Sequence, residues 1–248
     1  MKETTYTYYR DSLLKDDNDE CYCTSGLLFR ECCGAKNVDK APPKGIHIIK
    51  NFIPETELTK LINFLKKQAT QPLQVIDSEK SSQGNVVFKD DPTRVTEAVH
   101  YKKHKKTIFN LIKKALNEHL KPTFNEDIDN FELPNILKYK PGGFYKSHAD
   151  SDHFDAKLNM WLKVLNRDGS LLIYLNDDYI GGDLTFTKLN YTYKPTAGDL
   201  VFFPSHHLYS HQANPVESGV KYAIVSWVPF MSSEKLYEPP GTTARLKL

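Results

Sequence analysis

The chain has 248 residues, of which 40% are hydrophobic and 26% are charged, as in globular proteins rather than disordered ones. Its 33 basic and 31 acidic residues give a formal net charge of +2, which argues against a nucleic-acid partner held by a broad basic surface. The sequence has no apolar run near the roughly 20 residues needed to span a bilayer, and its start lacks the apolar segment of a signal peptide. We therefore expect a cytoplasmic protein without a membrane partner.

The first distinctive feature along the chain is a group of cysteines that follows a polar, acidic arm at residues 1–20. All four cysteines fall within thirteen positions: Cys21, Cys23, Cys32 and Cys33. A disulfide framework would spread its bridges through the fold, whereas a tight group is typical of a metal site. Four thiolates at the corners of a tetrahedron suit Zn²⁺. Two disulfides or free thiols are the alternative.

The cysteine spacing, Cys-x-Cys-x8-Cys-Cys with Ser25 and Gly26 after the second cysteine, resembles the SEC-C motif, a small zinc-binding module. The resemblance implies a structural Zn²⁺ within residues 21–36, because a site closed by four cysteines leaves no coordination position open for chemistry. It also implies a docking role, with a ribosome or secretion component as the partner. Prolines and a glycine then predict a linker at residues 37–45.

Two amphipathic helices are expected early in the main domain, which we place at residues 46–231. In residues 54–68 the apolar side chains recur at i, i+3, i+4 and i+7, and the same stripe returns in residues 105–120. Between these helices, residues 77–95 are polar and predict a hairpin or lid. The basic run HYKKHKK at residues 100–106 is expected to be a solvated helix face.

The second half of the domain is expected to consist of short β-strands. Segments rich in β-branched and aromatic residues alternate with Pro, Gly, Asn and Asp from about Leu133 onward. With the early helices they predict an α+β fold that is mainly β: a double-stranded β-helix, or jelly roll, with supporting N-terminal helices and the small zinc-binding segment. Residues 232–248 would form a C-terminal tail. The expected strands are NILKYK, SLLIYLN, DLTFTKL, DLVFFP and VKYAIVSWV.

A histidine and an aspartate stand two residues apart shortly after a glycine pair. Side chains at i and i+2 of a strand project from the same face, so His148 and Asp150 can converge on one divalent metal ion. A third ligand is needed, and the candidates in the last strands are His206, His207 and His211.

We favour His211 because of the segment that follows it. Lys221 lies ten residues further on, in a strand where it shares one face with Ala223, Val225 and Trp227. If that face lines the interior of a barrel, the lysine is buried and needs an anionic partner, for which a ligand carboxylate is suited.

Five sequence elements occur in one order between residues 139 and 227: HAD, IYLND, GGDLTF, PTAGDLVFFPS and the ending H…PV…G-K-Y. With them the chain resembles the prolyl 4-hydroxylase branch of the iron(II)- and 2-oxoglutarate-dependent dioxygenases. The resemblance implies that His148, Asp150 and His211 bind Fe(II), and that 2-oxoglutarate chelates the iron through its C1 carboxylate and keto oxygen. It further implies that the distal carboxylate pairs with Lys221 and accepts a hydrogen bond from Tyr174.

Other aromatic residues are expected around the same cavity. Tyr139 would adjoin the cosubstrate, and Tyr145 and Trp227 would line the substrate pocket, although core packing alone would explain each of them. Loop or rim positions are expected for the remaining histidines of this region: His153, His206 and His207.

The function that the resemblance implies is oxidative. The chain would hydroxylate a side chain of a protein or peptide, with proline as the first candidate, and release succinate and CO₂. The cofactors would be Fe(II), 2-oxoglutarate and O₂, with ascorbate in support. The alternatives are the same chemistry on lysine, a nucleobase or a small molecule, or a non-catalytic, zinc-stabilised module that binds peptides.

Overall fold

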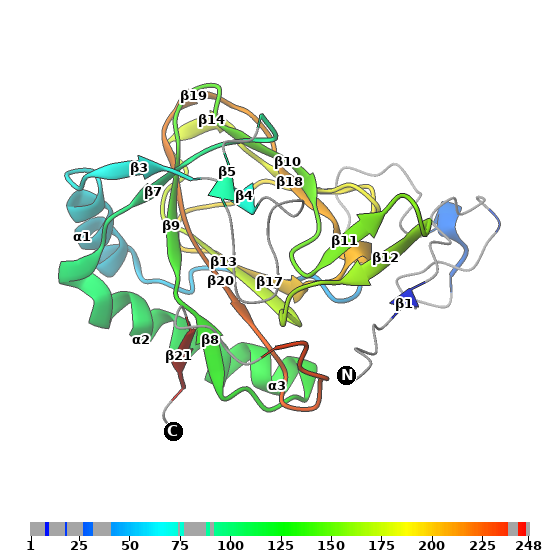
Figure 1. Ribbon diagram of the computed structural model, residues 1–248. Coiled ribbons are helices and arrows are strands. Elements are labelled where there is room, and N and C mark those ends of the chain that lie inside the picture. Colours follow the sequence, from blue (N-terminus) through cyan, green and yellow to red (C-terminus); the bar gives the residue numbers. More distant parts are fainter. Residues whose placement is uncertain are drawn as a thin grey trace.

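Two antiparallel β-sheets pack face to face around a shared interior (Figure 1). Apolar side chains of both sheets form this interior: Leu184 and Phe186 come from the smaller sheet, and Val201 and Phe203 from the larger one. The expected fold, mainly β and of the jelly-roll type, is confirmed. This computed structural model describes residues 8–9, 18, 27–31, 41–73, 75–76, 88–89, 92–237 and 243–246, so the four cysteines of the expected zinc segment lie outside the described residues.

The larger sheet has seven strands in the order β2-β17-β13-β20-β9-β7-β3. Strand β13 pairs with β17 on one side and with β20 on the other, and the next strand, β9, places Tyr139 opposite Lys221. Four of the five strands expected from the sequence lie in this sheet. The bounds are β2 (His47–Ile49), β3 (Thr70–Pro72), β7 (Glu97–Val99), β9 (Asn135–Tyr139), β13 (Gly169–Tyr174), β17 (Leu200–Pro204) and β20 (Lys221–Val228).

The smaller sheet has five strands in the order β16-β15-β18-β10-β6. They are β6 (Arg94–Val95), β10 (Phe144–His148), β15 (Leu184–Phe186), β16 (Tyr191–Tyr193) and β18 (His211–Ala213). Shorter ribbons complete the fold: β11 (Asp152–Asp155) with β12 (Met160–Lys163) and β1 (Tyr8–Tyr9), β14 (Tyr179–Gly181) with β19 (Val216–Gly219), β8 (Asn130–Glu132) with β21 (Thr243–Arg245), and β4 (Val75–Ile76) with β5 (Phe88–Lys89).

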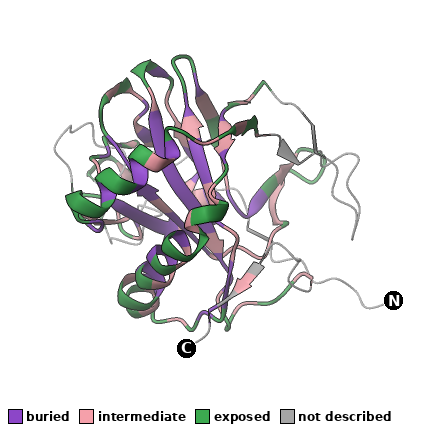
Figure 2. Cartoon of the chain, turned by 90° about the vertical axis from the view of Figure 1, so that its left-hand side faces the viewer, coloured by how far each residue is buried: buried purple, intermediate pink, exposed green. Residues whose placement is uncertain are grey.

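Helices α1 (Glu55–Leu65) and α2 (Lys105–Ala115) cover the outer face of the larger sheet. Their buried residues are those of the apolar stripes, and Figure 2 shows each helix with a buried inner side and an exposed outer side. A π-helical turn (Leu116–Leu120) and α3 (Lys121–Phe124) continue α2. Among the described residues, every helix is too short or too polar to cross a bilayer.

Strand β20 links the helix layer to the interior of the barrel. Its side chains alternate, so Tyr222 and Ile224 pack in the core beneath the helices, while Ala223 and Val225 face the space between the sheets. Lys221 belongs to the inward-facing set and is only 2% exposed. The alternation of side chains along β20 therefore points the amine of Lys221 into the barrel, as expected from the sequence.

Candidate metal and cosubstrate site

Three potential metal ligands meet where strands β10 and β18 lie side by side. The strand register places His148 opposite His211, with ring centroids 4.5 Å apart, and Asp150 follows β10 by two residues. Nε2 of His148 lies 3.5 Å from Oδ1 of Asp150, and Nε2 of His211 lies 3.7 Å from Oδ2. One ligand atom from each residue falls within 4.8 Å of the others, in the single such cluster that the described part of the chain contains.

Both imidazoles are oriented by backbone carbonyls. Nδ1 of His148 lies 2.9 Å from the carbonyl oxygen of Lys146, and Nδ1 of His211 lies 3.0 Å from that of Tyr209. Since a carbonyl can only accept, each Nδ1 carries a hydrogen, which leaves Nε2 as the nitrogen through which each ring can bind a metal ion. Burial lowers the pKa of His211 to about 4, so this imidazole is neutral at pH 7.

Asp150 is held by neighbours that leave its carboxylate ionised. Burial alone would raise its pKa, but interactions with His211, His148 and the nearby Arg167 hold the pKa of Asp150 well below its usual range. The hydroxyl of Ser170 donates to Oδ2 at 2.6 Å, and the backbone N–H of Asp150 donates to the carbonyl of Ser205 at 3.2 Å. Two imidazole nitrogens and one anionic oxygen suit a mid-row divalent metal.

A buried cation lies deeper in the same barrel. Nζ of Lys221 donates a hydrogen bond to the carbonyl of Gly182 and has no carboxylate within ion-pair distance among the described residues. Burial lowers the pKa of Lys221 to about 7, and only Asp183 opposes this shift. Gly182 has φ +69°, and a Cβ there would lie 3.2 Å from Cδ of Lys221, so glycine leaves room for the lysine stem.

Three tyrosine rings surround this amine. The ring centroids of Tyr139, Tyr174 and Tyr179 lie 5.3, 5.2 and 6.0 Å from Nζ. In the described part of the chain the buried hydroxyls of Tyr174 and Tyr179 have no hydrogen-bond partner. Burial raises the pKa of both, so each hydroxyl keeps its proton and can donate. A cation beside two unused donors fits a carboxylate, which agrees with the chemistry expected of 2-oxoglutarate.

From the sequence we expected Lys221, Tyr174 and Tyr139 at the 2-oxoglutarate site, and the structure brings these three residues together. It missed Tyr179. The available signal was its position shortly before the glycine pair of the GGDLTF turn.

Comparison with known proteins supports the same assignment. Residues 134–229 match the model of the 2OG-Fe(II) oxygenase superfamily. This segment, called the matched segment below, contains the three ligand candidates and Lys221. The resemblance to the iron(II)- and 2-oxoglutarate-dependent dioxygenases is thereby confirmed for this part of the chain, and Fe(II), 2-oxoglutarate and O₂ are the cofactors that the superfamily implies.

Individual relatives extend the likeness beyond the matched segment. A putative prolyl 4-hydroxylase of Acanthamoeba polyphaga mimivirus is 34% identical over 126 residues, which cover 46% of this chain and 51% of that protein. A PKHD-type hydroxylase of Psychrobacter sp. (strain PRwf-1) is 28% identical over 197 residues, or 74% of this chain and 68% of that protein. The chain thus spans about half of the length of the mimivirus relative.

Solved structures share the fold. The viral collagen prolyl hydroxylase of Paramecium Bursaria Chlorella virus-1, crystallised with 2OG, aligns with a TM-score of 0.51 and 23% identity, over 79% of this chain and 97% of that one. A Trichoplax adhaerens prolyl hydroxylase in complex with a hypoxia inducible factor peptide fragment aligns with a TM-score of 0.53 and 20% identity, over 77% and 88%.

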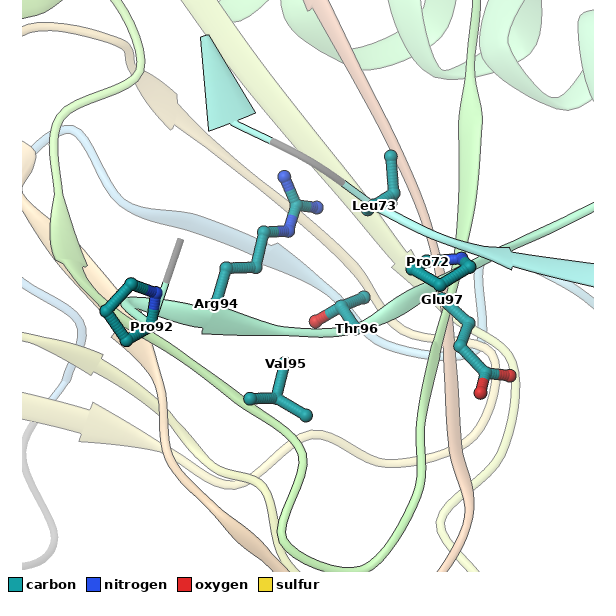
Figure 3. A pocket seen from close by; sticks show the side chains of 7 residues that line it. All are labelled: Pro72, Leu73, Pro92, Arg94, Val95, Thr96 and Glu97. Carbon is teal, nitrogen blue, oxygen red and sulfur yellow. The ribbon is translucent and has the colours of Figure 1, made fainter. Parts of the chain in front are cut away.

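An open pocket adjoins the matched segment on the side of β6. The ring of Tyr145 stacks on His148 at 3.7 Å, and the guanidinium carbon of Arg94 lies 4.5 Å from the centre of the Tyr145 ring. Arg94 also lines a pocket of about 440 Å³, in which it points to the same side as Leu73 while Val95 points away (Figure 3). The lining residues are Pro72, Leu73, Pro92, Arg94, Val95, Thr96 and Glu97. Tyr145 thus connects the pocket to a metal ligand, whereas no sequence pattern pointed to Arg94.

On another side of the metal cluster a half-buried arginine lies over an indole ring. The guanidinium of Arg167 forms two hydrogen bonds to Glu132 and lies 3.9 Å from the centre of a Trp227 ring. It also donates to the carbonyl of Asp150 at 3.1 Å. Nε1 of Trp227 is buried and has no partner among the described residues. The expected place of Trp227 at the substrate pocket stays a prediction. Arg167 was missed, since nothing local distinguishes it in the sequence.

The expectation for His207 is wrong, since the residue is buried and only 2% exposed rather than placed on a rim. Its Nδ1 and backbone N–H lie 2.8 and 2.9 Å from Oδ2 of Asp152, and its ring stacks on Trp161 of β12 with centroids 5.0 Å apart. These contacts fix the β11–β12 ribbon to the barrel. His153 is exposed, although it lies in strand β11 rather than in a loop, and His206 is half-buried, as expected of a rim residue.

Proposed function

We propose that the chain is an iron(II)- and 2-oxoglutarate-dependent dioxygenase that hydroxylates a side chain of a protein or peptide, with proline as the first substrate to test. The observation that carries the proposal is the combination, inside one barrel, of a two-histidine, one-aspartate cluster with a buried lysine that has no carboxylate partner among the described residues. The family match over residues 134–229 supports the same chemistry.

Each residue of the site would have a distinct role. His148, Asp150 and His211 would hold Fe(II) on one side and leave adjacent coordination positions open. Lys221 and Tyr174 would bind the distal carboxylate of 2-oxoglutarate, with Tyr179 as a second hydroxyl donor and Tyr139 as part of the wall. The bound iron, with 2-oxoglutarate and O₂, supplies the oxidation, in which one oxygen atom enters the substrate and the other enters succinate as CO₂ leaves.

The protein's own contribution would be to orient the ligands and exclude water. The two backbone carbonyls that accept from the histidines fix both rings before metal binds. The burial of Asp150, His211 and Lys221, each 6% exposed or less, keeps bulk water away from the oxidation.

A peptide substrate is supported by the open pocket beside Tyr145 and Arg94. Its donors could bind the backbone carbonyls of an extended chain, and Trp227 and Tyr145 offer flat apolar surface for a pyrrolidine ring. The names of the relatives point the same way, since the mimivirus protein is called a putative prolyl 4-hydroxylase. Lysine, a nucleobase or a small molecule would be the alternative substrates, and a non-catalytic peptide-binding module would be the alternative function.

The test is a 2-oxoglutarate turnover assay with Fe(II), ascorbate and proline-containing peptides. We expect succinate release that rises with peptide and a peptide mass increased by one oxygen atom. His148→Ala should abolish both, while His153→Ala, an exposed histidine outside the site, serves as the matched control. Fe(II) binding without any 2-oxoglutarate turnover would favour the non-catalytic module.

The N-terminal motif is proposed to bind a structural zinc ion. Residues 21–36 would form this module, 37–45 the linker, 46–231 the dioxygenase domain and 232–248 the tail, in a cytoplasmic protein whose zinc module docks to a ribosome or secretion component. The Cys-x-Cys-x8-Cys-Cys spacing supports the proposal. Elemental analysis should find one zinc per chain, and Cys21→Ser with Cys23→Ser should remove it without altering the iron content.

A further inference from the structure

The basic run of the sequence forms a distinct surface that the proposed active site does not use. Residues 100–125 contain seven lysines and a single acidic residue, Glu118, although the whole chain is nearly neutral. We call the lysines that gather on α2 and the turn before it the basic face. It consists of Lys102, Lys103, Lys105, Lys106, Lys113 and Lys114.

The basic face lies opposite the buried side of the helix. Lys106 and Lys113 are seven residues apart, two helical turns, and therefore point in the same direction, while Ile108, Ile112 and Ala115 pack in the core. The outward sides of the helices are exposed, as Figure 2 shows. No member of the basic face has an ion-pair partner within the part of the chain that the structure describes.

The end of helix α1 lies beside the basic face, while the first turn of this helix carries the acidic Glu55 and Glu57. The ring of Phe64 on α1 lies 3.7 Å from that of His104, at the start of α2, so the two helices touch beside the basic face. The exposed Lys60 and Lys67 lie about one turn on either side of Phe64. Unpaired like charges at this density repel each other, and an anionic partner would relieve the repulsion.

We propose that the basic face docks an acidic segment of a polypeptide partner. From Lys102 to Lys114 the chain rises about 18 Å at 1.5 Å per helical residue, which is the reach of about six extended residues. The partner chemistry is therefore a run of about six residues rich in Asp and Glu.

The composition of the face favours a polypeptide over a nucleic acid or a membrane. It contains no arginine, which forms the bidentate contacts to phosphate, and its aromatic neighbours Tyr101 and Phe109 are half-buried rather than presented for base stacking. Its apolar side chains face the core, so none is free to enter a bilayer.

The position of the face relative to the pocket adds a prediction that depends on the proposed function. Glu97 lines the pocket beside the metal cluster, and Lys102 follows five residues later, so at most about 18 Å of chain separates them. A substrate that carries its acidic segment about five or more residues from the hydroxylated residue could bind both sites at once, which would raise its effective concentration.

The experiment measures fluorescence anisotropy of two labelled probes without iron or 2-oxoglutarate, so that it does not depend on catalysis. The probes are a peptide of about six glutamates and a short DNA duplex. The variant combines Lys102→Glu, Lys103→Glu and Lys106→Glu. The control combines Lys44→Glu, Lys194→Glu and Lys235→Glu, three exposed lysines elsewhere, and undergoes the same change in net charge.

We expect the wild type and the control to bind the peptide with similar affinity, with binding that weakens as salt rises. The variant should bind the peptide about tenfold or more weakly, because it loses three exposed contacts between opposite charges. The absence of peptide binding, an equal loss in the control, or tighter binding to DNA than to the peptide would each overturn the proposal. Circular dichroism of both variants checks that they remain folded.

Discussion

Replacing Lys221 by Met should weaken 2-oxoglutarate binding and at the same time stabilise the protein that lacks the cosubstrate. Methionine has a similar volume but no charge, so it fills the space between Tyr139, Tyr174 and Gly182 without a clash. The loss of a charge-assisted hydrogen bond to a carboxylate is worth about 1.5–3 kcal/mol, or about 10- to 150-fold in affinity. The KM for 2-oxoglutarate, measured by succinate release, should rise by that factor.

The opposite effect on stability follows from the burial of the amine. A pKa lowered from 10.5 to about 7 corresponds to at most about 5 kcal/mol of unfavourable free energy when Lys221 is charged in the folded state. At pH below 7 the amine is protonated in both states and this penalty is fully present. Between pH 7 and 10.5 the unfolded state binds more protons, so the free energy of unfolding rises with pH.

Urea denaturation without iron and 2-oxoglutarate measures this effect. The contribution of Lys221 should make the wild type about 2 kcal/mol more stable at pH 9 than at pH 7, and Lys221→Met should lack that difference. Lys138→Met is the matched control, because Lys138 lies on the adjacent strand opposite Tyr222, which packs on the helix side of the sheet. If Lys221→Met left the KM for 2-oxoglutarate unchanged, the assignment of the cosubstrate pocket would be refuted.

Three further substitutions test the site and its support. His211→Ala removes one of three ligands, so Fe(II) affinity, titrated directly, should fall by more than about 100-fold; an unchanged affinity would exclude His211 from the metal site. Tyr174→Phe removes one neutral donor worth about 1 kcal/mol, so the KM for 2-oxoglutarate should rise about fivefold with little change in kcat, and no rise would mean that the hydroxyl stays unused. Asp199→Ala should lower the free energy of unfolding in urea by about 2–4 kcal/mol, because Oδ2 of Asp199 accepts hydrogen bonds from Lys50, Tyr193 and Thr196; a loss below about 0.5 kcal/mol would show that this network contributes little.

The elements that could be predicted from the sequence are those defined by local periodicity. The apolar stripes of α1 and α2 and the alternation along β20 each depend on neighbouring residues, and the structure has all three. His148 and Asp150 were likewise predicted from their spacing of two residues, but β10 ends at His148, so the strand period alone does not place Asp150.

The residues that could not be predicted owe their positions to pairing between distant segments. Arg94 reaches Tyr145 because β6 pairs with β10, and no pattern within residues 92–97 encodes that register. Tyr179 reaches Lys221 through the β14–β19 ribbon. The error for His207 has the same origin, because Asp152 and Trp161 bury it through a ribbon that forms only in the tertiary structure.

Some buried polar groups of the protein are fully satisfied and others are not, and the position of two unsatisfied hydroxyls argues for a ligand at Lys221. Asp152 has no role in the proposed chemistry, and both of its oxygens are satisfied, Oδ1 by Ser151 and Oδ2 by His207. The hydroxyls of Tyr174 and Tyr179 are also buried, but they have no partner among the described residues. A buried polar group without a partner costs about 1–3 kcal/mol, so two unpartnered hydroxyls that both lie beside the buried amine favour a ligand with oxygen acceptors at this position.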